Sequence, residues 1–246
     1  MNRYLVAFAA FLMSLCAGVP SVSADLADKI EKRPLPAGPV LHRAPESANW
    51  VITFVYPKAL KTENESGPEP SRRLQTLTVT KTKEIYFEVK MYSDGSRRES
   101  WHVGNLQISA PAGTRNYNTY EPSSFSESNA DPSLYTDYSK TDFPAMGWVS
   151  AQNYIGMHTV RDAEYLIFQQ SIQSIVPEMG YGVSLLTACI DAHTRLPIWV
   201  QSRDAMLSYQ FNAAPQARLT LPGEVQQILD KRAKAVKTLT TTVPSF

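Results

Sequence analysis

The sequence predicts a mainly β (α+β) protein, built as a curved antiparallel sheet or unclosed half-barrel with one or two covering helices. Short runs in which apolar and polar residues alternate recur along the chain, as expected for half-buried strands. Clusters of Gly, Asn, Asp and Pro separate these runs. The period of an amphipathic helix is clear only near the C-terminus. We find no internal repeat and expect a single β-rich domain over residues 49–246.

The first 24 residues have the features of a secretory signal peptide. Arg3 precedes an apolar run from Tyr4 to about Gly18, and Val22-Ser23-Ala24 is a small-residue cleavage signature. A membrane span needs roughly 20 apolar residues, and no later segment is apolar for that long. We therefore expect a periplasmic or secreted protein that has no stable membrane span after the signal is cleaved.

Charge and cysteine content limit the classes of partner. Removing residues 1–24 takes away Arg3 and Cys16, so the basic residues fall from 24 to 23 and equal the 23 acidic residues. A neutral protein lacks the basic footprint of nucleic-acid binding, so we expect no nucleic-acid partner. The single remaining cysteine cannot form an internal disulfide, and the core alone must hold the fold.

The elements follow in order from residue 25. Residues 25–48 contain four prolines, which exclude regular structure and predict a linker or an extended arm. The body begins at Asn49 with a strand, WVITFVY, and a proline-rich polar loop follows at residues 57–73.

Residues 83–109 predict a hairpin with one apolar face, because Ile85, Phe87 and Val89 alternate with polar residues. A two-residue Asp-Gly turn would break the apolar face on the return strand. A three-residue loop, residues 93–95, with glycine in the left-handed conformation places Phe87 opposite Trp101 and Ile85 opposite Val103. We therefore predict the second register.

Residues 111–147 have no sustained period and are rich in Tyr, Ser, Asn and Pro. A loop of this length is either a recognition element or an excursion without a ligand, and the sequence leaves both open. Strands resume at about residue 148, with a turn near Arg161-Asp162 and a break at residues 177–180. An amphipathic helix is predicted at about residues 222–237.

Cys189, Asp191 and His193 alternate along one predicted strand and its turn. At ~3.3 Å per residue, Cys189 and His193 would be ~13 Å apart, so no base would activate the thiol. A register with Ile190 opposite Leu196 and a turn at residues 192–194 places His193 at an exposed tip. Asp191 would then close the turn by accepting backbone hydrogen bonds or pair with Arg195.

We expect no enzymatic activity, metal or cofactor. Asp191 and His193 could share a metal ion if the turn curled, but two ligands are too few for a metal site. The sequence also has no nucleophile elbow, phosphate loop or dinucleotide fingerprint. His42, His102 and His158 are scattered among polar or loop residues. A carboxylate pair assembled from distant strands stays open, because such a pair needs no local motif.

The large apolar side chains of the predicted sheet are the candidate ligand contacts. A face covered fully by a helix would be ordinary core, whereas a concave face covered only in part would bind a lipid, a lipoprotein acyl chain or another hydrophobic guest. The alternative function is an envelope interaction protein that binds a protein or glycan partner through the Tyr/Ser/Asn-rich loop. The candidate ligand contacts are Phe87, Val89, Trp101, Val103, Ile167 and Trp199.

The late hairpin resembles that of the lipoprotein-localisation-factor superfamily, the LolA/LolB-like periplasmic carriers and their outlying relatives among exported bacterial proteins of unknown function. The residues that carry the resemblance are Asp191, Thr194, Leu196 and Pro197. Asp142-Phe143-Pro144, Trp148 and the stretch at residues 153–156 are similar to the middle of such proteins. The resemblance implies an unclosed antiparallel barrel with an apolar concave face that binds acyl chains. It transfers no functional residue position by position.

Overall fold

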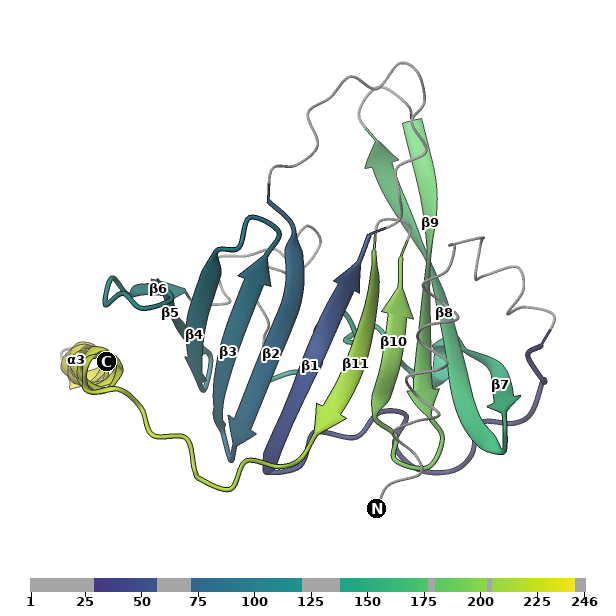
Figure 1. The fold of residues 1–246 in the computed structure, drawn as a ribbon, viewed down its shortest axis with the longest axis horizontal. Helices are drawn as coiled ribbons and strands as arrows, with labels where there is room; N and C mark the ends of the chain where they lie inside the picture. The colour runs from purple at the N-terminus through teal and green to yellow at the C-terminus, as the bar shows by residue number, and fades with distance from the viewer. Residues whose placement is uncertain (1–28, 57–71, 121–137, 177–179, 203–204, 242–246) are drawn as a thin grey trace, which may run out of the picture.

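The computed structural model describes residues 29–56, 72–120, 138–176, 180–202 and 205–241 (Figure 1). The expected signal peptide, most of the loop at residues 57–73 and the central part of the Tyr/Ser/Asn-rich loop lie outside the described residues.

The described residues form one antiparallel sheet of 11 strands, in the order β6-β5-β4-β3-β2-β1-β11-β10-β9-β8-β7. β6 and β7 are its two edges and do not pair with each other, so the sheet is not closed into a barrel. The predicted fold class is therefore confirmed. The strands are β1 (Ser47–Val55), β2 (Leu74–Thr82), β3 (Ile85–Tyr92), β4 (Arg97–Val103), β5 (Leu106–Pro111), β6 (Asn118–Tyr120), β7 (Tyr154–Val160), β8 (Ala163–Val176), β9 (Gly180–Asp191), β10 (Pro197–Gln201) and β11 (Met206–Asn212).

The first strand of the chain, β1, lies in the middle of the sheet. β1 pairs with β2 on one side and with β11 on the other, so that Trp50 lies opposite both Val79 and Phe211. The meander β2 to β6 fills one half, and β7 to β11 fill the other half from the edge back to β1 (Figure 1). The β1–β11 pairing therefore joins the two ends of the body into one domain.

Two predicted hairpins are confirmed. Phe87 lies opposite Trp101, and the β3–β4 loop is closed by a hydrogen bond from Tyr92 N–H to Ser96 O at 3.0 Å. Gly95, with φ of 78°, supplies the left-handed residue of this loop. β7 and β8 turn through Arg161-Asp162, both with positive φ as a tight hairpin turn requires.

The predicted β9–β10 register is wrong. Ile190 lies opposite Pro197 instead of Leu196, and Val200 lies opposite Ala188, the place predicted for Ile198. The reason is a register shift between Pro197 and Trp199, typical of a β-bulge, together with a turn that includes Arg195 in the left-handed conformation.

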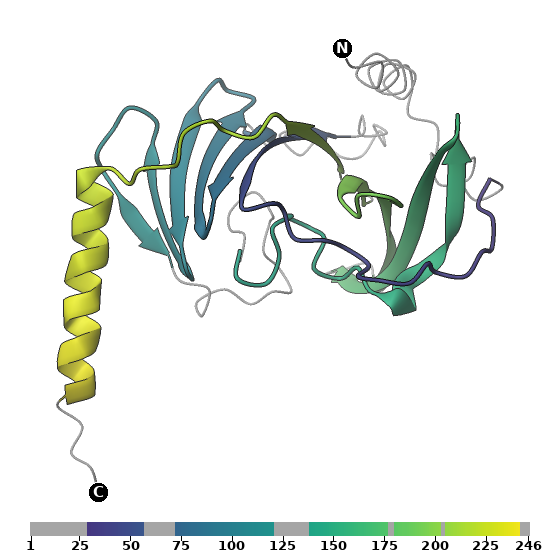
Figure 2. The same cartoon turned by 90° about the horizontal axis from the view of Figure 1, so that it is seen from below.

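The sheet arches over two segments that contain neither helix nor long strand (Figure 2). One is the arm, residues 29–46, and the other is the strap, residues 138–149, which leads into the 3₁₀ turn η2 (Ala151–Asn153). The main core lies between them and the concave face of the sheet. Its strand residues include Trp50, Ile52, Leu77, Phe168, Ile190, Val200, Leu207 and Tyr209.

The C-terminal helix α3 (Gly223–Thr241) lies outside this arch (Figure 2). Val225 is buried, and Ile228 and Leu229 are partly buried, in a cluster with Trp101 and Ile108 on the outer face. Later positions of the helix are largely exposed, as at Val236. The helix therefore covers only one end of the outer face, and the strap and most of the arm cover the concave face.

Candidate functional site

The six predicted ligand contacts lie on one face of the sheet, but it is the outer face. The strand registers place Phe87 and Trp101 opposite each other, and likewise Ile167, Cys189 and Trp199 in a row. Side chains on this face point away from the main core. Their proposed role as ligand contacts stays a prediction.

Four of these six residues fall in two clusters, and Val89 and Val103 are half-buried on the same face. At one end Phe87 and Trp101 pack together with tilted rings, their centroids 4.5 Å apart, in the cluster that α3 covers. At the other end Ile167 and Trp199 are buried with Cys189 and pack against Ile30 of the arm. Two half-buried threonines of β2 lie on the same face between the two clusters. Thr78 is opposite Val89, and Thr80 is opposite Phe87.

The Cys189 hairpin carries no catalytic arrangement. Cys189 is buried on the outer face, and burial raises the pKa of its thiol. His193 is exposed at the turn as predicted. Asp191 closes the turn as predicted, since its Oδ1 accepts hydrogen bonds from the backbone N–H groups of His193 and Thr194 at 3.0 and 2.7 Å. Arg195 donates to the arm carbonyls of Pro36 and Ala37.

The strap is the part of the predicted Tyr/Ser/Asn-rich loop that the structure places in the core. Tyr138, Phe143 and Met146 are each at most 3 % exposed. Phe143 packs edge-on against Trp50 and Tyr209, with ring centroids 5.6 and 6.1 Å away. The Tyr209 hydroxyl also donates a hydrogen bond to Pro144 O. This segment therefore forms core structure on the concave face.

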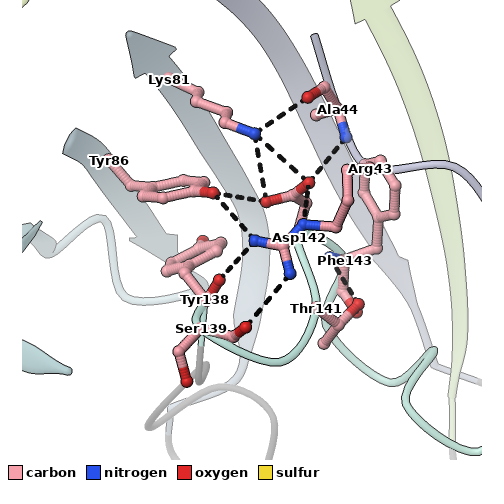
Figure 3. Close-up of polar contacts among 9 residues, drawn as sticks. All are labelled: Arg43, Ala44, Lys81, Tyr86, Tyr138, Ser139, Thr141, Asp142 and Phe143. Carbon is pink, nitrogen blue, oxygen red and sulfur yellow. Dashed lines mark hydrogen bonds and ion pairs between the residues drawn. The ribbon is translucent and has the colours of Figure 1, made fainter. Parts of the chain in front are cut away.

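Asp142 is the centre of a buried polar cluster that joins the strap to the arm and sheet (Figure 3). Its side chain is fully buried. Oδ2 accepts a hydrogen bond from Ala44 N–H at 2.6 Å and lies 2.9 Å from Arg43 Nε. Oδ1 accepts from the Tyr86 hydroxyl at 2.5 Å, and Lys81 Nζ is 3.4 Å from both oxygens.

The partners of Asp142 are themselves fixed. Lys81 is nearly buried and also donates to Ala44 O at 2.9 Å. Arg43 donates to Tyr138 O at 2.7 Å. Burial, followed by the hydrogen bond to Asp142, raises the pKa of Tyr86, so its hydroxyl keeps the proton that it donates. Two cations therefore face one fully buried carboxylate, and of these Lys81 is nearly buried and Arg43 is half exposed.

A second buried carboxylate, Glu88, lies on the same face of β3. The Tyr138 hydroxyl donates to Glu88 Oε1 at 2.5 Å, and Glu88 Oε2 lies 3.1 Å from His102 Nε2 and 3.5 Å from Lys90 Nζ. Burial alone would raise the pKa of Glu88, but the charges of Lys90 and His102 and these hydrogen bonds hold it well below its usual range. Stacking of Tyr86 on Tyr138, with centroids 4.1 Å apart, connects the two clusters.

The concave face is thus divided along the sheet. On β1 and β9 to β11 its described side chains are apolar, apart from the Tyr209 hydroxyl, and β8 adds Leu166 and Phe168 together with the half-buried Gln170. On β2 to β5 buried polar residues continue the same rows. Sequence analysis missed this polar end, because alternation assigned the polar residues of β3 to a solvated face. These polar residues are Lys81, Tyr86, Glu88, Lys90, Ser100, His102, Gln107 and Ser109.

In the part of the chain that the structure describes, no three His, Cys, Asp or Glu side chains gather in a way that would hold a metal ion. Among the same residues, no helix combines the length and hydropathy that crossing a bilayer requires.

No protein-family model matches the sequence, and no curated protein sequence matches it either. Among solved structures, the chain is similar to the Mycobacterium tuberculosis lipoprotein LppX, with a TM-score of 0.38 and 7% identity. The match covers 87% of this chain and 98% of LppX. A likeness at this level shows neither a shared family nor a shared function.

Proposed function

We propose that this protein is an exported, non-enzymatic binding protein that carries a hydrophobic ligand, such as a lipid or the acyl chain of a lipoprotein. The ligand lies between the concave face of the sheet and the strap. Residues 1–24 serve as the signal peptide that sends the protein to the periplasm or the exterior.

The division of the concave face is the observation that supports this proposal. One end, from β1 through β11 to β8, is apolar except for the Tyr209 hydroxyl and the half-buried Gln170, and the other end holds buried charges and hydroxyl groups. Ligand sites are mostly apolar and contain a few polar groups at fixed positions. This face, with one apolar end and one polar end, matches the two ends of an amphiphilic ligand.

The two segments that cover this face, the arm and the strap, also support the proposal. The arm and the strap have no helix or long strand of their own, so moving the strap breaks no regular backbone ladder. Within the apolar region, Phe143 and Met146 of the strap fill the space that a hydrocarbon chain would take. The Phe143 ring lies against three aromatic rings, those of Trp50, Tyr209 and Phe211.

Native mass spectrometry of the mature protein, followed by solvent extraction, tests the proposal. We expect a bound fatty acid or phospholipid, or uptake of one when the protein is incubated with lipid vesicles. A fully folded protein that neither retains nor takes up lipid would refute it.

Photo-crosslinking identifies the face that binds. A diazirine-labelled fatty acid should label Trp50, Met146 or Tyr209 if the chain lies on the concave face. Labelling of Phe87 or Trp101 would instead place the ligand on the outer face, where the structure places the ligand contacts predicted from the sequence. The two sets lie on opposite faces, so peptide mapping separates them.

A further inference from the structure

The Asp142 cluster has the composition of an anion-binding site. Four donors converge on one carboxylate: the Ala44 N–H, the Arg43 guanidinium, the Lys81 ammonium and the Tyr86 hydroxyl (Figure 3). All four come from the arm, β2 and β3, and none comes from the strap that carries Asp142. Ala44, Lys81 and Tyr86 are therefore fixed by segments other than the strap, whereas Arg43 also donates to the strap carbonyls of Tyr138 and Ser139. The carboxylate of Asp142 is the part of the site that can be exchanged.

The charges of the site favour an anion in place of Asp142. Arg43 and Lys81 give two positive charges against one negative charge. Lys81 Nζ is nearly buried, and a buried ammonium without a counterion is costly. If the strap leaves, the remaining donors need another anion of similar size.

The strap itself has the polarity of a fatty acid. Asp142 supplies a carboxylate, and Phe143 and Met146, which follow it, are buried in the apolar core. The carboxylate therefore sits at the polar end of the concave face, and the apolar side chains lie towards the apolar end.

We propose that the donors around Asp142 form a binding site for the carboxylate of a fatty acid or other long-chain carboxylic acid, and that the strap occupies it as an internal competitor. This inference rests on the proposed function and names its ligand class. The ligand carboxylate replaces that of Asp142, and its hydrocarbon chain replaces Phe143 and Met146. Binding exchanges one carboxylate for another and needs no covalent step.

The test compares dodecanoate with dodecanol, which has the same chain and no charge, by isothermal titration calorimetry. The Asp142→Asn variant keeps the shape of the side chain and removes the competing charge. We expect it to bind dodecanoate more tightly than the wild type by about tenfold or more, since charge-assisted hydrogen bonds become available. Dodecanol affinity should change by no more than about twofold, because the alcohol gains no such bonds.

Lys81→Met in the Asp142→Asn background should abolish the preference for the acid. Lys83→Met is the matched control, because Lys83 is exposed two residues further along the chain. If Asp142→Asn does not fold, Phe143→Ala provides a second variant that loosens the strap without changing a donor. This variant should bind both probes better than the wild type, with the acid still preferred.

The outcomes separate the two proposals. Equal tightening of dodecanoate and dodecanol in Asp142→Asn would overturn the carboxylate site and leave hydrophobic-ligand binding intact. An unchanged preference after Lys81→Met, or tighter binding of dodecyl phosphate than of dodecanoate, would also overturn the carboxylate assignment. If no variant binds either probe, both proposals fail.

Discussion

Gly156 gives the sharpest test of how the arm is held. It lies in edge strand β7 with φ of 151°, and a Cβ at this position would lie 2.5 Å from Ile30 Cγ2 and 2.6 Å from Glu31 O. Two backbone hydrogen bonds fix the arm beside it, from Glu31 N–H to Met157 O at 2.8 Å and from Met157 N–H to Glu31 O at 2.9 Å. An alanine at position 156 therefore cannot fit unless the arm moves.

The cost of Gly156→Ala follows from these contacts. A non-glycine residue in such a conformation costs about 1 to 3 kcal/mol. Displacing the arm loses two backbone hydrogen bonds, each with a net contribution of about 1 kcal/mol. We expect the free energy of unfolding to fall by about 3 to 5 kcal/mol, a large share of the roughly 5 to 15 kcal/mol typical of a domain.

Gly104→Ala is the matched control, because Gly104 also has positive φ, at 59°, but has no atom within 4 Å of its Cβ position. It should lose only the conformational part, about 1 to 2 kcal/mol. Urea unfolding measures both variants, and trypsin cleavage after Lys32 reports release of the arm, because Pro34 blocks cleavage after Arg33. Equal destabilisation of the two variants, with unchanged cleavage after Lys32, would refute the close approach of arm and strand.

Three further predictions concern single side chains. The pKa of Glu88 is lower in the folded than in the unfolded state. The ionised side chain therefore stabilises the fold above pH about 4.5, and this stabilisation is lost as the pH falls further. In urea unfolding, the difference in stability between the wild type and Glu88→Gln should shrink between pH 7 and pH 3. Cys189 should react with a thiol reagent only after denaturation, because burial raises its pKa, and fast labelling of the native protein would contradict this. Asp191→Ala should lower stability by about 1 to 3 kcal/mol in chemical denaturation, since the backbone N–H groups of His193 and Thr194 lose their acceptor, whereas His193→Ala should change it by less than about 0.5 kcal/mol.

The β3–β4 hairpin was predictable because its loop and its apolar face specify the same register. Only the three-residue loop places Phe87 opposite Trp101, and Gly95 can adopt the left-handed conformation that this loop needs. The register of the β9–β10 hairpin was not predictable, because a bulge changes it without a clear signal in the sequence. Arg195 adopts φ of 57° there, a conformation that its residue type does not indicate.

The strap could not be found from periodicity, because it is neither helix nor strand. Its residues reach the core as single anchors, with Phe143 against Trp50 and the Asp142 carboxylate among donors from three other segments. Such contacts depend on the tertiary arrangement of distant residues and leave no local pattern. The Asp-Phe-Pro stretch stands out in the sequence only through the family resemblance.

The two faces of β3 explain why the candidate site was missed. Alternation separates Phe87 and Val89 from Tyr86, Glu88 and Lys90, but it does not say which set faces the core. The apolar set is the usual choice, since buried charges are costly unless they are paired. Here Glu88 is paired within its own face, and Tyr138 of the strap completes the pairing, so the polar set can lie inside. A charged end and a mainly apolar end therefore share one concave surface, and the proposed binding of amphiphiles depends on that shared surface more than on either strand pattern alone.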